Sequence, residues 1–424
     1  MSSPVAVFRP GRPPAMLDPA SARERSVRRR VCLAWGLLFV NALGYVGTVV
    51  HIPSVVGKGI TQGALPVAII VALTVNRRVI VRPNAYLCLV CLLPAGAFLT
   101  ALQPESFGTV YRTFRLVEFC VALWLLTPWW GRRDLLLVRA HLTTLGVILG
   151  SVLLGILVVP GQAFSEGRLN GALWQIPPTQ VAHYAAVTTG LVVVLWFCGH
   201  LPGRITLAIV IVAVGMLLLT RTRTALIGMT AGVLIAGLSL IVARSRVRRL
   251  FAVGGGVAAI VILTLSSVIT TYLARGEGSQ ELTQLTGRTK VWGPLLAFPR
   301  DEFQRIFGFG LSNSSFNGLP IDSNWLSSYQ EQGLFGVAVC VAILLFLFIT
   351  AYFQPRGVYR ALALFLATYC LIASFTEDGF TDATPYLLEL TLAASLLATS
   401  LVSRNLRGSE AEPWAEVLLQ KRPA

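Results

Sequence analysis

The sequence predicts an all-α polytopic membrane protein with about twelve transmembrane helices and one large external loop between the ninth and tenth spans. Three observations lead to this fold class. Of the 424 residues, 55% are hydrophobic and 13% are charged, and a soluble domain has about twice that charged share. The mean hydropathy is +0.70. Many apolar runs are also close to the 20 or so residues that cross about 30 Å of hydrocarbon as a helix.

The apolar runs define the expected spans in order. They lie near residues 31–51, 60–75, 85–103, 113–130, 140–160, 180–198, 205–220, 224–243, 250–273, 334–353, 361–376 and 385–403. The first run is long enough to remain as a span and lacks a clear small-residue cleavage site, so we expect no cleavable signal peptide here. We expect a basic tail over 1–30, a single transmembrane domain over 31–403 and a polar tail over 404–424.

Basic residues alternate between the connections. The segments NRRVIVRPN, GRRDLLLVR, RSRVRR and QPRGVYR fall on one side with both termini, and 24 of the 35 Lys and Arg residues lie there. The positive-inside rule makes this side the cytoplasm, so both termini are expected inside and the loop over 274–333 outside. The same bias explains the net charge of +16. Since basic and aromatic residues do not interleave, we expect no nucleic-acid partner.

The sequence favours chemistry without a metal or a cofactor. Seven cysteines lie within or beside apolar runs and show no disulfide framework or metal spacing. HExxH, GxSxG and P-loop motifs are absent. The first external loop, HIPSVVGKG, has no carboxylate, and Asp301–Glu302 are flanked by Arg300 and Arg305, which favours pairing within the loop.

Eleven basic residues remain on the external side, against the topological bias. Among them are Arg168 in SEGRLNGALWQIPPTQ, Arg221 and Arg223 in TRTRT, and Arg288 and Lys290 in the large loop. An ionisable group close to the membrane is costly unless it has a partner or a task. Chance or rim salt bridges explain some of these cations, whereas a set that converges on one face favours an anionic ligand. Arginine suits phosphate, because its planar fork donates two parallel charge-assisted hydrogen bonds.

If that ligand is a lipid-linked sugar pyrophosphate, sugar transfer also needs a base for the incoming hydroxyl. Asp322 precedes SNWLSSYQEQGLFG, where the chain returns to the membrane, and partial desolvation there would suit a carboxylate to this role. A helix N-cap or a surface charge are the alternatives for Asp322. Among the histidines near the outer surface we consider only His183, in QVAHYAA, for this role, and it is alternatively an interfacial hydrogen-bonding residue.

Three further sets of residues near the external side are candidate ligand contacts, namely three aromatic residues, Glu377, and Glu331 in the large loop. Trp292, Trp325 and Tyr329 would stack on sugar faces, and an interfacial aromatic belt explains them equally well. Glu377, in FTEDGF, either orients an arginine or is a solvated loop charge.

The large loop resembles that of the O-antigen ligase and polysaccharide polymerase family. The matching elements are Gly287-Arg288 with Trp292, the GFG at 308–310, Asp322-Ser323, and the Glu331-x-Gly333-Leu334-x-Gly336 segment. Thr222-Arg223-Thr224-Ala225 matches a second family element, and Arg168 with Gly171 matches a third. The resemblance covers roughly residues 160–380, and its strength comes from the order of the motifs and their common side of the membrane.

The resemblance implies a multi-span glycosyltransferase at the outer face of the bacterial cytoplasmic (inner) membrane, in cell-wall or exopolysaccharide biosynthesis. Such an enzyme passes a glycan from an undecaprenyl (polyprenyl) pyrophosphate carrier to an acceptor hydroxyl, on lipid A core for ligases or on another carrier-linked repeat for polymerases. Arg223 and Arg288 would hold the pyrophosphate with help from Arg168, Arg221 and Lys290. The histidine that serves as base in ligases corresponds to Asp322 here, which favours a polymerase-like or divergent member, or a lost base.

A twelve-span transporter or lipid-linked glycan flippase is the competing class, and a non-enzymatic assembly partner is a third. Transporters place ionisable residues near the midplane of the membrane. Here the intramembrane carboxylates are few, Glu118 and Glu389, and the polar residues gather in one external loop. This distribution favours chemistry at the membrane surface.

Overall fold

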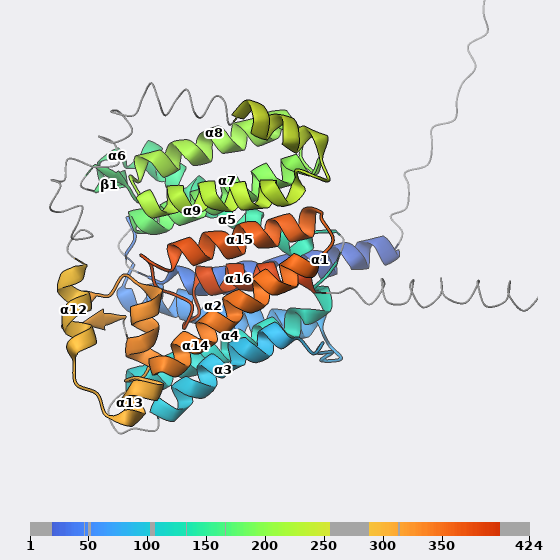
Figure 1. The fold of residues 1–424 in the computed structure, drawn as a ribbon. Helices are drawn as coiled ribbons and strands as arrows, with labels where there is room; N and C mark the ends of the chain where they lie inside the picture. Colours follow the sequence, from blue (N-terminus) through green and yellow to red (C-terminus); the bar gives the residue numbers. More distant parts are fainter. Residues whose placement is uncertain are drawn as a thin grey trace, which may run out of the picture.

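Long apolar helices make up almost all of the described structure (Figure 1). The computed structural model describes residues 19–45, 47–49, 52–101, 107–132, 134–165, 167–254, 288–312 and 314–398. The strands in these ranges form two short antiparallel hairpins, β1–β2 (Phe164–Ser165 with Arg168–Leu169) and β3–β4 (Ser315–Phe316 with Leu319–Pro320). The helical character that the composition predicts is confirmed.

Eleven of the predicted spans coincide with helices in the described ranges. These are α1 (Pro19–Leu43), α2 (Ser54–Val75), α3 (Ala85–Ala101), α4 (Phe107–Leu126), α5 (Leu136–Val158), α7 (Pro178–Phe197), α8 (Gly203–Leu219), α9 (Arg223–Leu240), α14 (Asn324–Phe353), α15 (Val358–Ala373) and α16 (Pro385–Leu397). A 3-10 turn, η1 (Thr127–Trp129), follows α4, and a short helix, α6 (Pro160–Ala163), follows α5. Most of the expected ninth span (250–273), the first part of the large loop (274–287), most of the tail over 1–30 and all of the tail over 404–424 lie outside the described residues.

Several of these helices have the properties of membrane spans. By length and composition, α2, α5, α7, α9 and α14 are able to cross a membrane, whereas α3, α8, α15 and α16 are apolar but shorter. The outward faces carry large apolar side chains, such as Val147, Leu157 and Ile211, which are 69%, 80% and 62% exposed. Such faces suit contact with lipid and indicate a membrane protein. The count of twelve spans and the orientation of the termini stay predictions.

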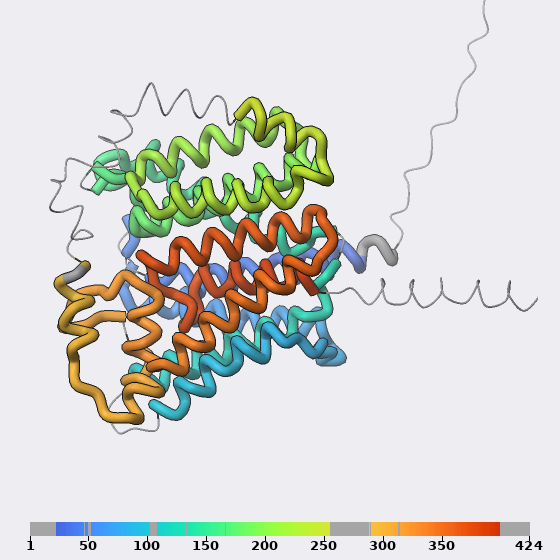
Figure 2. The backbone as a smooth tube through the Cα atoms, in the orientation of Figure 1, coloured from blue at the N-terminus to red at the C-terminus, as the bar shows by residue number. Residues whose placement is uncertain are grey.

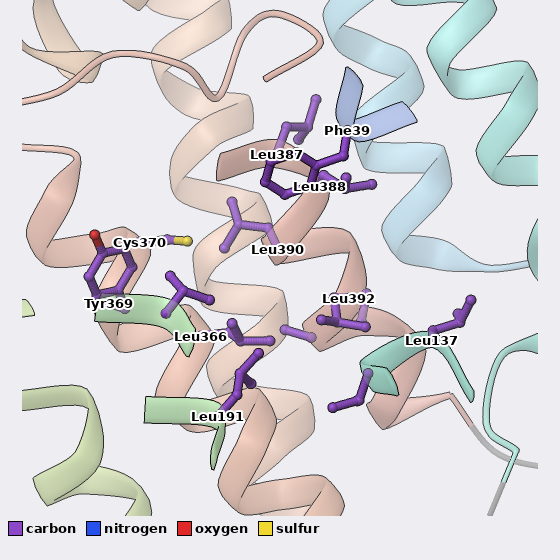
Figure 3. Close-up of a cluster of buried hydrophobic side chains, with 14 of the residues drawn as sticks. Phe39, Leu137, Leu191, Leu366, Tyr369, Cys370, Leu387, Leu388, Leu390 and Leu392 are labelled. Atoms are coloured by element: carbon purple, nitrogen blue, oxygen red, sulfur yellow. The ribbon is translucent and has the colours of Figure 1, made fainter. Parts of the chain in front are cut away.

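The centre of the bundle is formed by α7, α15 and α16. Helix α15 packs against α9 and α16, and α7 packs against α8 and α9. Nearly every residue of α16 is buried, as expected for a helix that is apolar on all sides. Figure 3 shows side chains of this core, with Phe39, Leu191, Leu366 and Leu388 among them. The loop between α15 and α16 therefore emerges from the middle of the bundle.

The described part of the large loop folds over one end of the bundle (Figures 1 and 2). It contains α12 (Thr289–Ala297), α13 (Glu302–Phe307) and the β3–β4 hairpin. A small second core of Val291, Leu295, Phe316 and Ile321 joins α12 to the hairpin. We call the end of the bundle where α7, α9 and α14 begin the site end. Helix α1 finishes there, because Gln175 N donates to Gly47 O over 2.9 Å, so α1 starts at the opposite end.

A backbone break at Gly333 divides α14, which begins at Asn324 and so takes up the last part of the predicted loop. Gly333 has φ 63° and ψ −158°, a region that is almost restricted to glycine. The GFG turn packs against this break, where Gly310 N donates to Glu331 O over 2.9 Å. A Cβ atom on Gly333 would lie 2.4 Å from the carbonyl carbon of Ile306, and one on Gly308 would lie 2.4 Å from that of Glu331. The two glycine motifs of the loop thus form one close backbone contact.

Candidate functional site

Arg168 links the β1–β2 hairpin to the turn between α8 and α9. Its Nε donates to Thr220 O over 3.0 Å, and its Nη2 donates to Thr222 Oγ1 over 3.3 Å. Both threonines are buried. These bonds fix the guanidinium of Arg168 beside the TRTRT turn at the site end. The third external loop and this turn, which lie apart in the sequence, therefore share one site.

Arg288 reaches the same region from the start of α12. Its Nη2 donates to Thr376 O over 3.2 Å. The Thr376 hydroxyl in turn lies 2.7 Å from the hydroxyl of Thr224, in the first turn of α9. Arg223 precedes Thr224 directly. Arg223 and Arg288, which the sequence suggests as a pair, therefore stand at the same end of the bundle and are connected through two threonines.

The other two predicted cations lie beside these arginines in the chain. Arg221 occupies the turn with a positive φ of 53°. Its Nη1 is 3.7 Å from the place where a Cβ atom on Gly167 would lie, so its side chain extends towards the β1–β2 hairpin. Lys290 is exposed in the first turn of α12. The five predicted cations thus come from three segments at the site end.

Asp322 lies next to Arg288, with 3.8 Å between its Oδ2 and the Arg288 Nε. Its side chain is 46% exposed, so the partial desolvation that we expected there is modest. The N-cap interpretation is wrong, because the N-cap residue of α14 is Ser323. Asp322 has a positive φ of 44°, which is uncommon for a residue other than glycine. The backbone at this position therefore turns sharply just before the chain enters α14.

The strongly desolvated carboxyl group of the site is Glu377, between α15 and α16. Burial, followed by the nearby Asp322 carboxylate, raises the pKa of Glu377 from 4.5 to about 8. Arg288 and Arg168 lower this pKa without cancelling the effect of burial. Burial also raises the pKa of Asp378. At neutral pH Glu377 is mostly protonated, so the five cations face little opposing charge from this side chain.

Glu331, which we assigned to ligand binding, is buried and holds a loop. Its Oε1 lies 3.0 Å from Ser312 N and 3.1 Å from Ser314 N, and both serine hydroxyls are within 3.3 Å. Only 1% of its surface is exposed. These contacts give Glu331 the geometry of an internal acceptor for the 312–314 turn. It positions the loop and has no open face for a ligand.

The aromatic candidates also have internal contacts. Trp292 Nε1 donates to Ile321 O over 2.8 Å, which joins α12 to the residue before Asp322. Trp325 packs beside Phe375, with 6.1 Å between the ring centroids. Tyr329 lies under the guanidinium of Arg300 at 4.1 Å. Trp292 therefore positions the backbone at Asp322.

Arg300 and Asp301 do not pair as the sequence suggested. Arg300 instead donates to Gln330 Oε1 over 2.7 Å. Asp301 is the N-cap of α13, where its carboxylate accepts from Gln304 N over 2.6 Å. In place of the expected ion pairing, Arg300 hydrogen-bonds to Gln330 and Asp301 caps α13.

Sequence reasoning missed a second charged group at the site end. Arg115 Nη2 lies 2.7 Å from Asp382 Oδ2, and Arg112 Nη1 lies 3.7 Å from the same oxygen. Arg112 also donates to Ser312 O, in the turn that Glu331 holds. The two arginines lie three residues apart at the start of α4 and are among the external cations. That spacing was the available signal, but Asp382 is distant in the sequence.

A further polar network lies inside the bundle. Glu389 is fully buried, and its Oε1 is 2.8 Å from His183 Nε2 and 3.8 Å from His141 Nε2. His183 Nδ1 lies 3.0 Å from the hydroxyl of Tyr369, and Trp35 Nε1 donates to His141 Nδ1 over 3.3 Å. His183 is 1% exposed, and its hydrogen-bonding partners lie inside the bundle. The network joins α1, α5, α7, α15 and α16.

The cations at the site end are suited to bind an anion, and the carboxyl groups beside them are suited to contact a hydroxyl group of a ligand. Arg288 contacts Thr376, both Arg168 and Arg288 act electrostatically on Glu377, and Asp322 adds a half-exposed carboxyl group beside Arg288. No protein-family model matches the chain, and a comparison with curated proteins also gives no match. The functional conclusion therefore depends on this geometry and on the motifs of the sequence.

Proposed function

We propose that the protein is a membrane glycan polymerase or ligase that uses a polyprenyl-pyrophosphate-linked glycan as donor. The observation that carries this proposal is that Arg288 contacts the segment at Thr376 and that both Arg168 and Arg288 lie close enough to Glu377 to lower its pKa. Guanidinium groups bind phosphate through paired charge-assisted hydrogen bonds. A neutral carboxyl group beside them donates a hydrogen bond to the same anion without repelling it.

In the proposed reaction an acceptor hydroxyl oxygen attacks the anomeric carbon of the carrier-linked sugar. A new glycosidic bond forms, and the bond between the anomeric carbon and the pyrophosphate oxygen breaks. The electron pair leaves with the polyprenyl pyrophosphate, whose growing charge Arg288 and Arg223 stabilise, with Arg168, Arg221 and Lys290 nearby. Asp322 accepts the hydroxyl proton as general base. The base is half-exposed, which gives an acceptor glycan access to it.

The test uses the full chain in lipid nanodiscs with a polyprenyl-pyrophosphate oligosaccharide, and glycan length is measured by gel or mass spectrometry. We expect longer glycan from the wild type and a rate loss of about 100-fold or more in R288Q, the size found when one stabilising donor is removed. D322N is expected to lose activity while it still binds the donor. R305Q and D301N are matched controls, since both alter exposed loop residues away from the site. Equal losses in R288Q and R305Q would refute the proposal.

A transporter or flippase remains the second candidate, and the buried network around Glu389 favours it. Ionisable residues inside a membrane bundle often mark the path of a proton or substrate. The two functions differ in one measurement with a fluorescent carrier-linked glycan in vesicles. Movement across the bilayer without a change in glycan length would support transport. Growth of the glycan with no dependence on Glu389 would support the transferase.

A further inference from the structure

A basic cavity lies at the opposite end of the bundle from the candidate site. It has a volume of about 620 Å³ and lies between the first turns of α1, the last turn of α2 and the connection to α3. Arg23 and Arg30 line it from α1, where a spacing of seven residues puts them on one face of the helix. Arg77 and Arg78 line it from the connection. A water molecule takes up about 30 Å³ of liquid, so the cavity has room for a phosphate with its hydration or a larger headgroup.

The four arginines are concentrated without acidic partners. No carboxylate lines the cavity, and in the part of the chain that the structure describes none of the four forms an ion pair. The nearby acids are engaged elsewhere. Glu24 and Asp134 pair with Arg28, at 2.9 Å and 3.4 Å, and also with Arg132. The charges on α1 are therefore sorted into a paired group and a purely cationic group.

The connection that carries Arg77 and Arg78 is held in place by Asn76. The Asn76 side chain donates to Ile80 O over 2.8 Å and to Leu125 O over 3.0 Å, and it accepts from Ile80 N over 2.9 Å. Asn76 is 5% exposed. A fixed backbone reduces the conformational entropy lost when a ligand orders the arginines, and this favours binding.

An apolar stripe leads from the cavity along α2. Thr74 lines the cavity, and Val67 and Ile70 lie on the same face, seven and four residues earlier. They are 46% and 60% exposed. A ligand with a phosphate and an attached hydrocarbon chain would satisfy both features, with the phosphate among the arginines and the chain against this stripe. A free phosphate ion shares only the first feature.

We propose that this cavity binds the phosphate headgroup of an anionic membrane lipid. Basic recesses of this kind between membrane helices recognise anionic headgroups through the charge of several Lys or Arg residues. The inference does not depend on the proposed transferase function, because it concerns other residues at the other end of the bundle and is measured by lipid binding alone.

The experiment is a lipid titration of the full chain in detergent, followed by native mass spectrometry. The probes are phosphatidylglycerol, phosphatidylcholine and inorganic phosphate. We expect phosphatidylglycerol to bind better than phosphatidylcholine to the wild type. Its Kd should weaken about 30-fold in R77Q/R78Q, about five-fold for each arginine. R23Q/R30Q is a second variant that tests the cavity if R77Q/R78Q does not fold. We expect it to weaken binding of phosphatidylglycerol to a similar extent.

The matched control is R29Q/R204Q, which removes the same charge from exposed residues at the same end but outside the cavity. We expect its Kd for phosphatidylglycerol to equal that of the wild type. Equal weakening in the control and the cavity variants would overturn the proposal, as would no lipid preference. If inorganic phosphate displaces the bound lipid at equal concentration, the cavity is a site for a soluble phosphate and the lipid proposal fails.

Discussion

Replacing Glu377 by glutamine tests whether the site holds a carboxyl group in its neutral form. Glutamine keeps the size of the protonated side chain and cannot ionise. In the native protein the pKa of Glu377 is raised to about 8, first by burial and then by Asp322. In the unfolded chain the same group titrates near its ordinary value of 4.5. The two states therefore differ in bound protons over the range between these values.

The sign and size of the effect follow from this difference. Between pH 6 and pH 8 the unfolded carboxyl is ionised and the native one is mostly protonated, so the native state binds up to one more proton. Each pH unit then lowers the free energy of unfolding by up to about 1.4 kcal/mol, and the change from pH 6 to pH 8 is about 2 kcal/mol because the native carboxyl itself begins to ionise. This contribution is complete below pH 4.5 and is lost as the pH rises through the native pKa. E377Q lacks the contribution altogether.

The assay is thermal unfolding of the detergent-solubilised protein at pH 6, 7 and 8. We expect the wild-type midpoint to fall with pH more steeply than that of E377Q, so the variant gains relative stability at pH 8. D301N is the control, since it removes one negative charge at an exposed cap of the same loop and asparagine also serves as an N-cap. Parallel curves for the wild type and E377Q would refute the assignment of a neutral Glu377.

Two further predictions concern the packing that supports the site. Gly333→Ala should lower the free energy of unfolding by about 3 kcal/mol, because alanine is strained at this φ and its Cβ meets Ile306. Gly293→Ala is the control, and it should have little effect in the same thermal assay because the space around Gly293 is open. Glu389→Ala should destabilise by about 3 kcal/mol, because it leaves two buried histidines without their carboxylate. Glu389→Gln should cost less in a denaturant titration, and an unchanged midpoint for Glu389→Ala would contradict this.

The fold was predictable where a single apolar run of the sequence is enough to define a helix. The helices α3, α7 and α15 begin and end within a few residues of the apolar runs that predict them. Helix α14 was harder, because its first turns are polar and the sequence places them in the loop. Those turns are stabilised by contacts with the GFG segment and not by hydrophobic periodicity. Pattern reasoning therefore misplaced the start of the helix.

For the candidate site, sequence reasoning found the cations and ranked the carboxylates differently from the structure. Arg168 and Arg288 were identifiable because an external arginine opposes the topological bias. Asp322 was expected to be the desolvated carboxylate, and Glu377 has that environment instead. The spacing of Arg112 and Arg115 on α4 was visible in the sequence, but their partner Asp382 lies in the loop before α16, and only the fold brings the three together.

By itself the sequence determined that this is a helical protein with membrane-like apolar segments, and that its polar residues gather in one loop. Hydrophobicity and charge are local properties of a chain, so their pattern is readable without a fold. The tertiary structure decided which acids are desolvated, which glycines meet and which arginines share a cavity. Desolvation and charge coupling depend on the distances between segments that are remote in sequence, and only packing sets those distances.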